Sequence, residues 1–155
     1  MMASSGSRLV LPLGLAAAAA LAAGLYVGLV RAPADVVQGE VQRIMYLHVP
    51  TVLVAYLAFA VVFVGSIGYL LTRHEGWDIL APASAEIGVL FTALTIAAGA
   101  IWGKPTWGAW WTWDARLTTT AILLLIYLAY LMLRAAVEDR ARGARYAAVV
   151  GILGF

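Results

Sequence analysis

The chain has 155 residues, of which 64% are hydrophobic and 12% charged, and its mean hydropathy is +0.92. A soluble domain of this length needs a larger share of polar residues, so the composition predicts a protein of the lipid bilayer. The formal net charge of +2 is too small to indicate nucleic-acid binding, and the lack of cysteine excludes disulfides and thiolate metal sites within the chain.

Four stretches are long and apolar enough to cross the hydrocarbon core, which requires about 20 residues. They span residues 9–30, 51–71, 83–102 and 117–133. A fifth apolar stretch begins at Tyr146 and reaches Phe155, about half a crossing, so we expect the sequence to be a C-terminally truncated piece. The pattern predicts an all-α, polytopic transmembrane helix bundle that forms a single membrane domain over residues 1–155.

The distribution of Lys and Arg indicates the orientation, because short cytoplasmic loops carry an excess of these residues. If the N-terminus is inside, six basic residues lie on the inner side and four on the outer side, and the bias is concentrated between Arg134 and Arg145. We therefore expect a cytoplasmic N-terminus and two outer loops, at about residues 31–50 and 103–116.

The first outer loop contains a histidine, His48, just before the second span. Pro50 fits the first turn of that helix, so we expect His48 at the membrane interface. Imidazole there could ligate a metal ion or haem iron, although a lone histidine at a helix entrance is more often a surface or capping residue. His74 follows the same span, about 39 Å away along a helix, so the two histidines cannot ligate one iron, and we expect His74 in a solvated loop.

Five of the six tryptophans lie within twelve positions, at the end of the third span and in the second outer loop. If the segment after Pro105 is helical, four of its side chains share one helix face at i, i+3, i+4 and i+7 spacing. These are Trp107, Trp110, Trp111 and Asp114. Rigid aromatic faces suit a flat apolar ligand. The alternative is an aromatic belt at the membrane interface, but the density of indoles favours a ligand platform.

Two outer arginines, Arg43 and Arg116, could pair with carboxylates of a ligand on this platform, because the guanidinium fork matches both oxygens. Arg116 could equally pair with Asp114 or reach lipid headgroups. Glu86 lies in the third span near its cytoplasmic end and is a functional candidate, since intramembrane acids are costly, unless it simply reaches water. Glycines in the second and third spans predict close helix packing. They are Gly65, Gly68, Gly88 and Gly99.

The tryptophan-rich run has a recognisable form. Trp107-Gly-Ala-Trp-Trp-Thr-Trp-Asp-Ala-Arg-Leu-Thr118 resembles the WWD signature of the haem-handling proteins of cytochrome c biogenesis, and its Asp-Ala-Arg-Leu-Thr ending looks like the CcmC branch, haem exporter protein C. Further matches are Ala32-Pro-Ala-Asp35, Arg43-Ile-Met-Tyr-Leu-His-Val-Pro50 and Trp102-Gly-Lys-Pro-Thr-Trp107. The likeness runs in order from about Gly28 to the C-terminus.

The resemblance implies a fold of six spans with both termini cytoplasmic, of which this sequence would hold four and part of a fifth. It implies that His48 is an axial ligand of the haem iron; the second histidine of the family follows span five, beyond this sequence. The implied contacts with the macrocycle come from the WWD loop. They are Trp107, Trp110, Trp111, Trp113 and Asp114.

The implied activity is not enzymatic. The protein would present haem b at the periplasmic face of a bacterial inner membrane and pass it to the haem chaperone CcmE, alongside the CcmA/CcmB transporter and CcmD. An alternative is a membrane anchor or quinone-binding subunit of a respiratory complex, which predicts paired intramembrane ligands or acids that the spans do not offer. A transporter subunit ranks last, because it would need polar or broken helices near the membrane midplane, where the spans offer only Ser66, Thr92 and Thr95.

Overall fold

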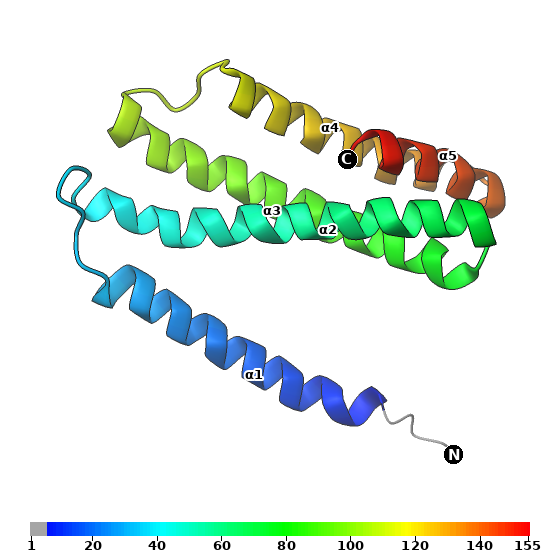
Figure 1. The fold of residues 1–155 in the computed structure, drawn as a ribbon, viewed down its shortest axis with the longest axis horizontal. Coiled ribbons are helices and arrows are strands. Elements are labelled where there is room, and N and C mark those ends of the chain that lie inside the picture. The colour runs from blue at the N-terminus through cyan, green and yellow to red at the C-terminus, as the bar shows by residue number, and fades with distance from the viewer. Residues whose placement is uncertain (1–5) are drawn as a thin grey trace. The chain divides into compact units, whose positions relative to one another are not determined.

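The computed structural model describes residues 6–155, and this part of the chain is helical without any β-strand. Figure 1 shows the elements in order. They are α1 (Gly6–Tyr26), the π-helical η1 (Val27–Arg31), the 3-10 helix η2 (Glu40–Ile44), α2 (Met45–Thr72), α3 (Glu75–Trp107), α4 (Ala115–Ala136) and α5 (Arg140–Leu153). The chain divides into two compact units, Met1–Leu47 and His48–Phe155. The predicted all-α class is confirmed.

Four helical segments have the length and hydropathy needed to cross a membrane. They are Leu9–Arg31, Glu40–Thr72, Glu75–Trp107 and Ala115–Ala136. The four predicted spans are therefore confirmed, but the helices extend beyond the apolar stretches that marked them. The fifth helix, α5, has 14 residues and is about 21 Å long at 1.5 Å per residue, shorter than the roughly 30 Å hydrocarbon core.

The first unit contains α1, η1, the connecting segment and η2. Gly28 in η1 lies against Tyr46, since a Cβ atom at this position would be 2.8 Å from Tyr46 Cβ. In the connecting segment, Asp35 Oδ1 accepts hydrogen bonds from the backbone N–H groups of Val37 and Gln38, both at 2.8 Å. These two bonds lower the pKa of the Asp35 carboxyl group, so they favour its charged form. The segment before η2 is thus an ordered, hydrogen-bonded turn.

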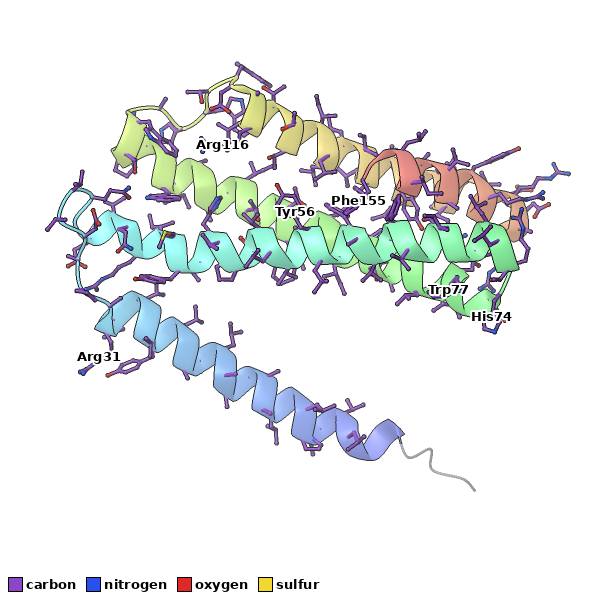
Figure 2. All side chains as sticks on the ribbon, in the orientation of Figure 1. Arg31, Tyr56, His74, Trp77, Arg116 and Phe155 are labelled. Atoms are coloured by element: carbon purple, nitrogen blue, oxygen red, sulfur yellow. The ribbon has the colours of Figure 1, made fainter. Side chains whose placement is uncertain are left out.

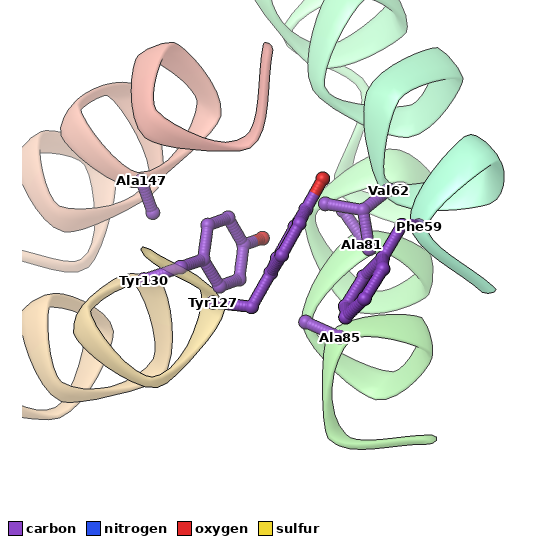
Figure 3. Packing of buried hydrophobic residues seen from close by; sticks show 7 residues of the cluster. All are labelled: Phe59, Val62, Ala81, Ala85, Tyr127, Tyr130 and Ala147. Atoms are coloured by element: carbon purple, nitrogen blue, oxygen red, sulfur yellow. The ribbon is translucent and has the colours of Figure 1, made fainter. Parts of the chain in front are cut away.

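The second unit is a packed helix bundle with aromatic side chains at its centre, shown in Figure 3. The buried cluster consists of Phe59, Val62, Ala81, Ala85, Tyr127, Tyr130 and Ala147. Phe59 of α2 stacks on Tyr127 of α4, with ring centroids 3.7 Å apart and an interplanar angle of 11°. Small alanines on α3 and α5 leave room for this aromatic pair. The helices α2, α3, α4 and α5 therefore share one core.

The predicted close packing at glycines is confirmed in this bundle. A Cβ atom on Gly65 would lie 3.2 Å from Ala81 Cβ, and one on Gly68 would lie 2.7 Å from the Trp77 indole. A Cβ atom on Gly88 would collide with the Phe59 ring. These glycines therefore let α2 and α3 pack closely at the points where the glycines lie.

An ion-pair cluster around the buried Asp78 joins three helices at one end of the bundle. Asp78 of α3 is 8% exposed, and its carboxylate lies 2.6 Å from Arg134 Nη1 of α4 and 3.2 Å from Arg140 Nε of α5. Arg140 also pairs with Glu75 at 3.3 Å. Figure 2 shows His74 and Trp77 at this end and Arg116 at the other. The two ends of the bundle thus differ: one is held by charges, and the other carries the aromatic loop.

Glu86 lies deeper in its helix than we predicted. Because α3 begins at Glu75 and not near residue 83, Glu86 follows the helix start by about 16 Å. Its side chain is exposed, and no ion pair links it to another residue in the described range 6–155. The structure assigns it no partner within the bundle.

Candidate functional site

A pocket of about 210 Å³ lies among α2, α3 and α4, at the end of the second unit where Arg116 is found (Figure 2). The side chains that line it from α2 are His48, Val52, Ala55 and Tyr56. Those from α3 are Thr92, Thr95, Ile96, Gly99, Trp102 and Trp107, and those from α4 are Arg116, Leu117, Thr120 and Leu123. The lining is mostly apolar, with an imidazole and a guanidinium as its two basic groups.

His48 reaches this pocket from the first turn of α2. We predicted that it would precede the helix, which is wrong, because η2 runs directly into α2 and the chain is helical from Met45. Pro50 therefore lies inside the helix and does not begin it. The carbonyl group of His48 accepts a hydrogen bond from Thr51 Oγ1 at 2.7 Å, and Thr51 accepts one from Thr95 Oγ1 at 3.0 Å. This hydroxyl chain ties the start of α2 to α3.

The imidazole of His48 packs against α3. Its ring centroid is 5.7 Å from that of Trp102, at an interplanar angle of 58°. The Nδ1 atom is buried; the backbone of Thr95 lies beside the ring, but no hydrogen bond of good geometry reaches Nδ1 from the described residues. A buried polar atom without a partner is costly, and this is one of few in the bundle.

A row of aromatic rings leads from His48 to the pocket rim. Trp102 and Trp107 have ring centroids 6.1 Å apart, and Arg116 Cζ lies 5.3 Å from the centre of the Trp107 ring. Arg116 also lies 3.8 Å from the Asp114 carboxylate. The structure therefore brings together three of the predicted site residues: His48, Trp107 and Arg116.

The predicted helical shelf of indoles is not formed. α3 continues through Pro105 and ends at Trp107, and Gly108 follows with φ 78° and ψ −3°. Its N–H bonds to the Lys104 carbonyl at 3.0 Å, which is the left-handed glycine cap that ends many helices. Residues 109–114 are then non-helical. The shelf depended on a helix after Pro105, and Gly108 ends that helix before Trp110, Trp111 and Asp114 can join it.

The remaining indoles of the loop lie outside the pocket lining. Trp110 is 58% exposed and Trp113 is 79% exposed. Trp111 is half-buried, meets Trp113 edge to face at 5.5 Å, and has a buried Nε1 atom without a hydrogen-bond partner among the described residues. Two large aromatic faces are thus left open beside the pocket and do not pack into it.

Asp114 begins α4. Its Oδ1 accepts a hydrogen bond from the Leu117 N–H at 2.9 Å, and its Oδ2 accepts one from the Thr112 hydroxyl at 2.8 Å. The bond from Leu117, followed by that from Thr112, lowers the pKa of this carboxyl group. Asp114 is therefore an N-cap residue, and it also fixes the end of the tryptophan loop.

Arg43 is held within the first unit. Its Nη1 donates to the Leu29 carbonyl at 2.8 Å and its Nη2 to the Ala32 carbonyl at 3.0 Å. Its Nε lies 2.8 Å from the Glu40 carboxylate. These contacts give Arg43 a structural role in closing the segment between η1 and η2.

His74 lies at the other end of the second unit from Arg116 (Figure 2). It is exposed, and its Nδ1 accepts a hydrogen bond from the Gly76 N–H at 3.1 Å, as the N-cap of α3. The prediction that His74 is a solvated loop residue, far from His48, is confirmed.

Thr95 and Trp102 are among the pocket residues that were not predicted as site residues. With Gly99 they occupy positions i, i+4 and i+7 of α3, so they share one helix face. That spacing was visible in the sequence. The sequence does not show that this face of α3 contacts His48, because the contact between α2 and α3 forms only in the folded bundle.

Comparisons with known proteins agree with the resemblance drawn from the tryptophan loop. The model of the family CcmC, described as Heme exporter protein C, matches residues 1–155. The Heme exporter protein C of Bradyrhizobium diazoefficiens is 44% identical over 134 residues, which are 86% of this chain and 51% of that protein. The protein of the same name from Haemophilus influenzae is 42% identical over 132 residues, or 85% of this chain and 54% of the relative.

The Heme exporter protein C of Escherichia coli K12 is 37% identical over 142 residues, which cover 92% of this chain and 58% of that protein. The chain thus spans about half the length of the curated relatives that it matches. The match of the family model extends over every residue, including the His48 segment and the tryptophan loop. The chain therefore belongs to the CcmC family, the Heme exporter protein C proteins.

Proposed function

We propose that this chain holds haem b at the outer face of a bacterial inner membrane, with His48 as an axial ligand of the iron. It would then pass the haem to the chaperone CcmE, together with the CcmA/CcmB transporter and CcmD. Haem is the cargo in this proposal, and the chain catalyses no reaction. The observation that carries it is the single pocket shared by His48, Trp107 and Arg116.

The donor set fits a porphyrin better than a bare metal ion. Within the described residues, no group of three His, Cys, Asp or Glu side chains could hold a metal. Iron inside haem already has four nitrogen ligands and needs only axial ones, for which histidine is common. The single imidazole of His48 would supply one such ligand.

The mostly apolar lining and the imidazole of the pocket suit haem, but the pocket is too small to enclose the whole molecule. At about 210 Å³ it is smaller than the roughly 300–1,000 Å³ of pockets that enclose small molecules. The pocket would therefore take only part of the macrocycle, and the rest would lie against the open indoles of Trp110 and Trp113, which are 58% and 79% exposed. Trp111 would contribute through the ring contact that positions Trp113. A haem held in this way stays accessible to a receiving protein.

The positive charge of Arg116 at the pocket rim suits the propionate groups of haem, which are carboxylates. The Arg116 side chain is 67% exposed and lies over Trp107, so its guanidinium can pair with a carboxylate while the cation–π contact remains. Asp114 would act by holding the loop that carries the indoles. A part for Arg43 requires it to exchange its partners Leu29, Ala32 and Glu40 for a propionate, so we assign the main role to Arg116.

The alternative of a quinone-binding or anchoring subunit needs paired ligands or acids at similar depth. In the described chain, His48 is the only histidine or acid in the pocket, and the buried Asp78 is committed to two arginines at the other end of the bundle. No observation favours this alternative.

Haem titration of the detergent-purified protein tests the proposal. His48→Ala is the test variant, and His74→Ala is its matched control because His74 lies at the opposite end of the bundle. We expect a Soret band for the unmodified protein and for His74→Ala, and a much weaker one for His48→Ala. A protein that stays colourless under haem-replete expression and takes up no added haem would contradict the proposal, as would equal binding by the two variants.

A further inference from the structure

The imidazole of His48 rests on a part of α3 that has no side chain. A Cβ atom added to Gly99 would lie 3.0 Å from His48 Cε1, 3.5 Å from Nδ1 and 3.9 Å from Nε2. One edge of the ring therefore faces the backbone of α3 across the space that a methyl group would fill. Contacts of 3.0 Å to a Cβ atom are tighter than ordinary van der Waals separation, so any other residue at position 99 would displace the ring.

The neighbouring turns of α3 enclose the same ring. One turn before Gly99, the Thr95 hydroxyl is linked through Thr51 to the backbone of His48. One turn after it, the Trp102 ring lies with its centroid 5.7 Å from that of the imidazole. Thr95, Gly99 and Trp102 thus form a notch on one face of α3 that restricts the position of His48 on three sides.

We propose that Gly99 is the positioning residue for His48: its lack of a side chain lets the imidazole sit in the notch at the depth and angle needed to ligate iron. The inference rests on the proposed function, because it concerns the same site. It adds a residue that touches neither iron nor macrocycle, and that acts only through the histidine.

The substitution Gly99→Ala tests this idea with a single methyl group. The imidazole has to move by a few tenths of an ångström to accommodate it. Changes to groups that orient a metal ligand typically lower affinity by about 10- to 100-fold, and we expect about tenfold weaker haem binding, because the shift is small. Alanine is a better helix former than glycine, so the variant should unfold at the same temperature as the unmodified protein or higher.

Two other glycines provide matched controls. Gly24 of α1 has open space where its Cβ would be, whereas a Cβ on Gly88 would collide with the Phe59 ring of the buried core cluster, and neither Gly88 nor Phe59 lines the pocket. Gly24→Ala should leave haem affinity unchanged and should unfold at the same temperature as the unmodified protein or higher. Gly88→Ala should lower thermal stability, and so it shows what a general packing defect does to haem binding.

A double-mutant cycle with His48→Ala separates positioning from a structural effect. If Gly99 acts through the imidazole, Gly99→Ala should weaken haem binding about tenfold in the unmodified background and have no effect when His48 is already alanine. The absorption spectrum of bound haem should also shift in Gly99→Ala, because the axial ligand is displaced. Equal losses in both backgrounds, or unchanged binding and spectrum in Gly99→Ala, would overturn the inference.

Two further outcomes are decisive. Should Gly99→Ala fail to fold, the double variant ought to fold, since its methyl group meets no imidazole; failure of the double variant would refute the contact. If His48→Ala binds haem as the unmodified protein does, the proposed function and the inference both fall. If His48→Ala weakens binding but Gly99→Ala does not, only the inference falls.

Discussion

Arg116 allows the proposed site to be tested separately from the fold. In the structure its guanidinium lies 5.3 Å over the Trp107 ring and 3.8 Å from the Asp114 carboxylate, with 67% of the side chain exposed. An exposed cation–π contact is worth about 0.5–1 kcal/mol, and an exposed ion pair about 0–1 kcal/mol. Arg116→Ala should therefore lower the free energy of unfolding by about 1 kcal/mol.

The effect of Arg116→Ala on haem binding should be larger than its effect on folding. A hydrogen bond to a charged group contributes about 1.5–3 kcal/mol, and the exposure of Arg116 places a propionate contact near the lower limit. A loss of about 1.4 kcal/mol is a tenfold weaker affinity. Arg116→Lys keeps the charge but loses the two-pronged geometry, so it should lie between the alanine variant and the unmodified protein.

The assay is titration with haem at low and high salt, with thermal unfolding measured in parallel. The unmodified protein should lose affinity as salt rises, because a rim-exposed ion pair is screened, and Arg116→Ala should lose this dependence. Unchanged haem affinity in Arg116→Ala at low salt would refute the assignment of the propionates to this residue.

Three other predictions concern the fold that supports the pocket. Phe59→Ala removes the ring stacked on Tyr127 and should destabilise the bundle by about 3–5 kcal/mol, as measured by denaturant unfolding in detergent; a loss below about 1 kcal/mol would mean that this pair does not anchor the core. Asp78→Asn leaves the arginine at position 134 without its carboxylate and should cost about 3 kcal/mol, the low end for a broken buried pair because Arg140 is largely exposed; a variant as stable as the unmodified protein would contradict this. Asp114→Asn should keep the helix cap and haem binding, whereas Asp114→Ala should weaken both; equal haem binding by the two variants would show that the cap does not hold the loop.

The number of spans and the fold class could be predicted from the sequence, because an apolar stretch of about 20 residues is what a helix needs to cross the hydrocarbon core of a membrane. The helix ends could not be predicted in this way. α3 begins eight residues before its apolar stretch, at Glu75, and includes Asp78, whose charge is compensated by Arg134 and Arg140. Such compensation depends on neighbours that are distant in sequence, so no local pattern reveals it.

Several residues of the candidate site could be predicted from the sequence, but their arrangement in space could not. The sequence pointed to His48, Trp107 and Arg116, which the structure places around one pocket. The helical shelf of indoles, which required a helix after Pro105, does not form because Gly108 adopts a left-handed conformation and ends α3. The notch that holds His48 could not be foreseen, since it depends on which face of α3 meets α2.

The identity of the iron ligand is the central claim, and it can be tested by changing the ligand atom. The chain has no cysteine, so His48→Cys introduces the only thiol, at the position proposed to face the iron. Thiolate and imidazole ligation give haem different absorption and paramagnetic resonance spectra. We predict that haem bound to His48→Cys shows the spectra of thiolate-ligated iron, while His74→Cys keeps those of the unmodified protein. Identical spectra for His48→Cys and the unmodified protein would contradict the account, because the iron would then be ligated elsewhere.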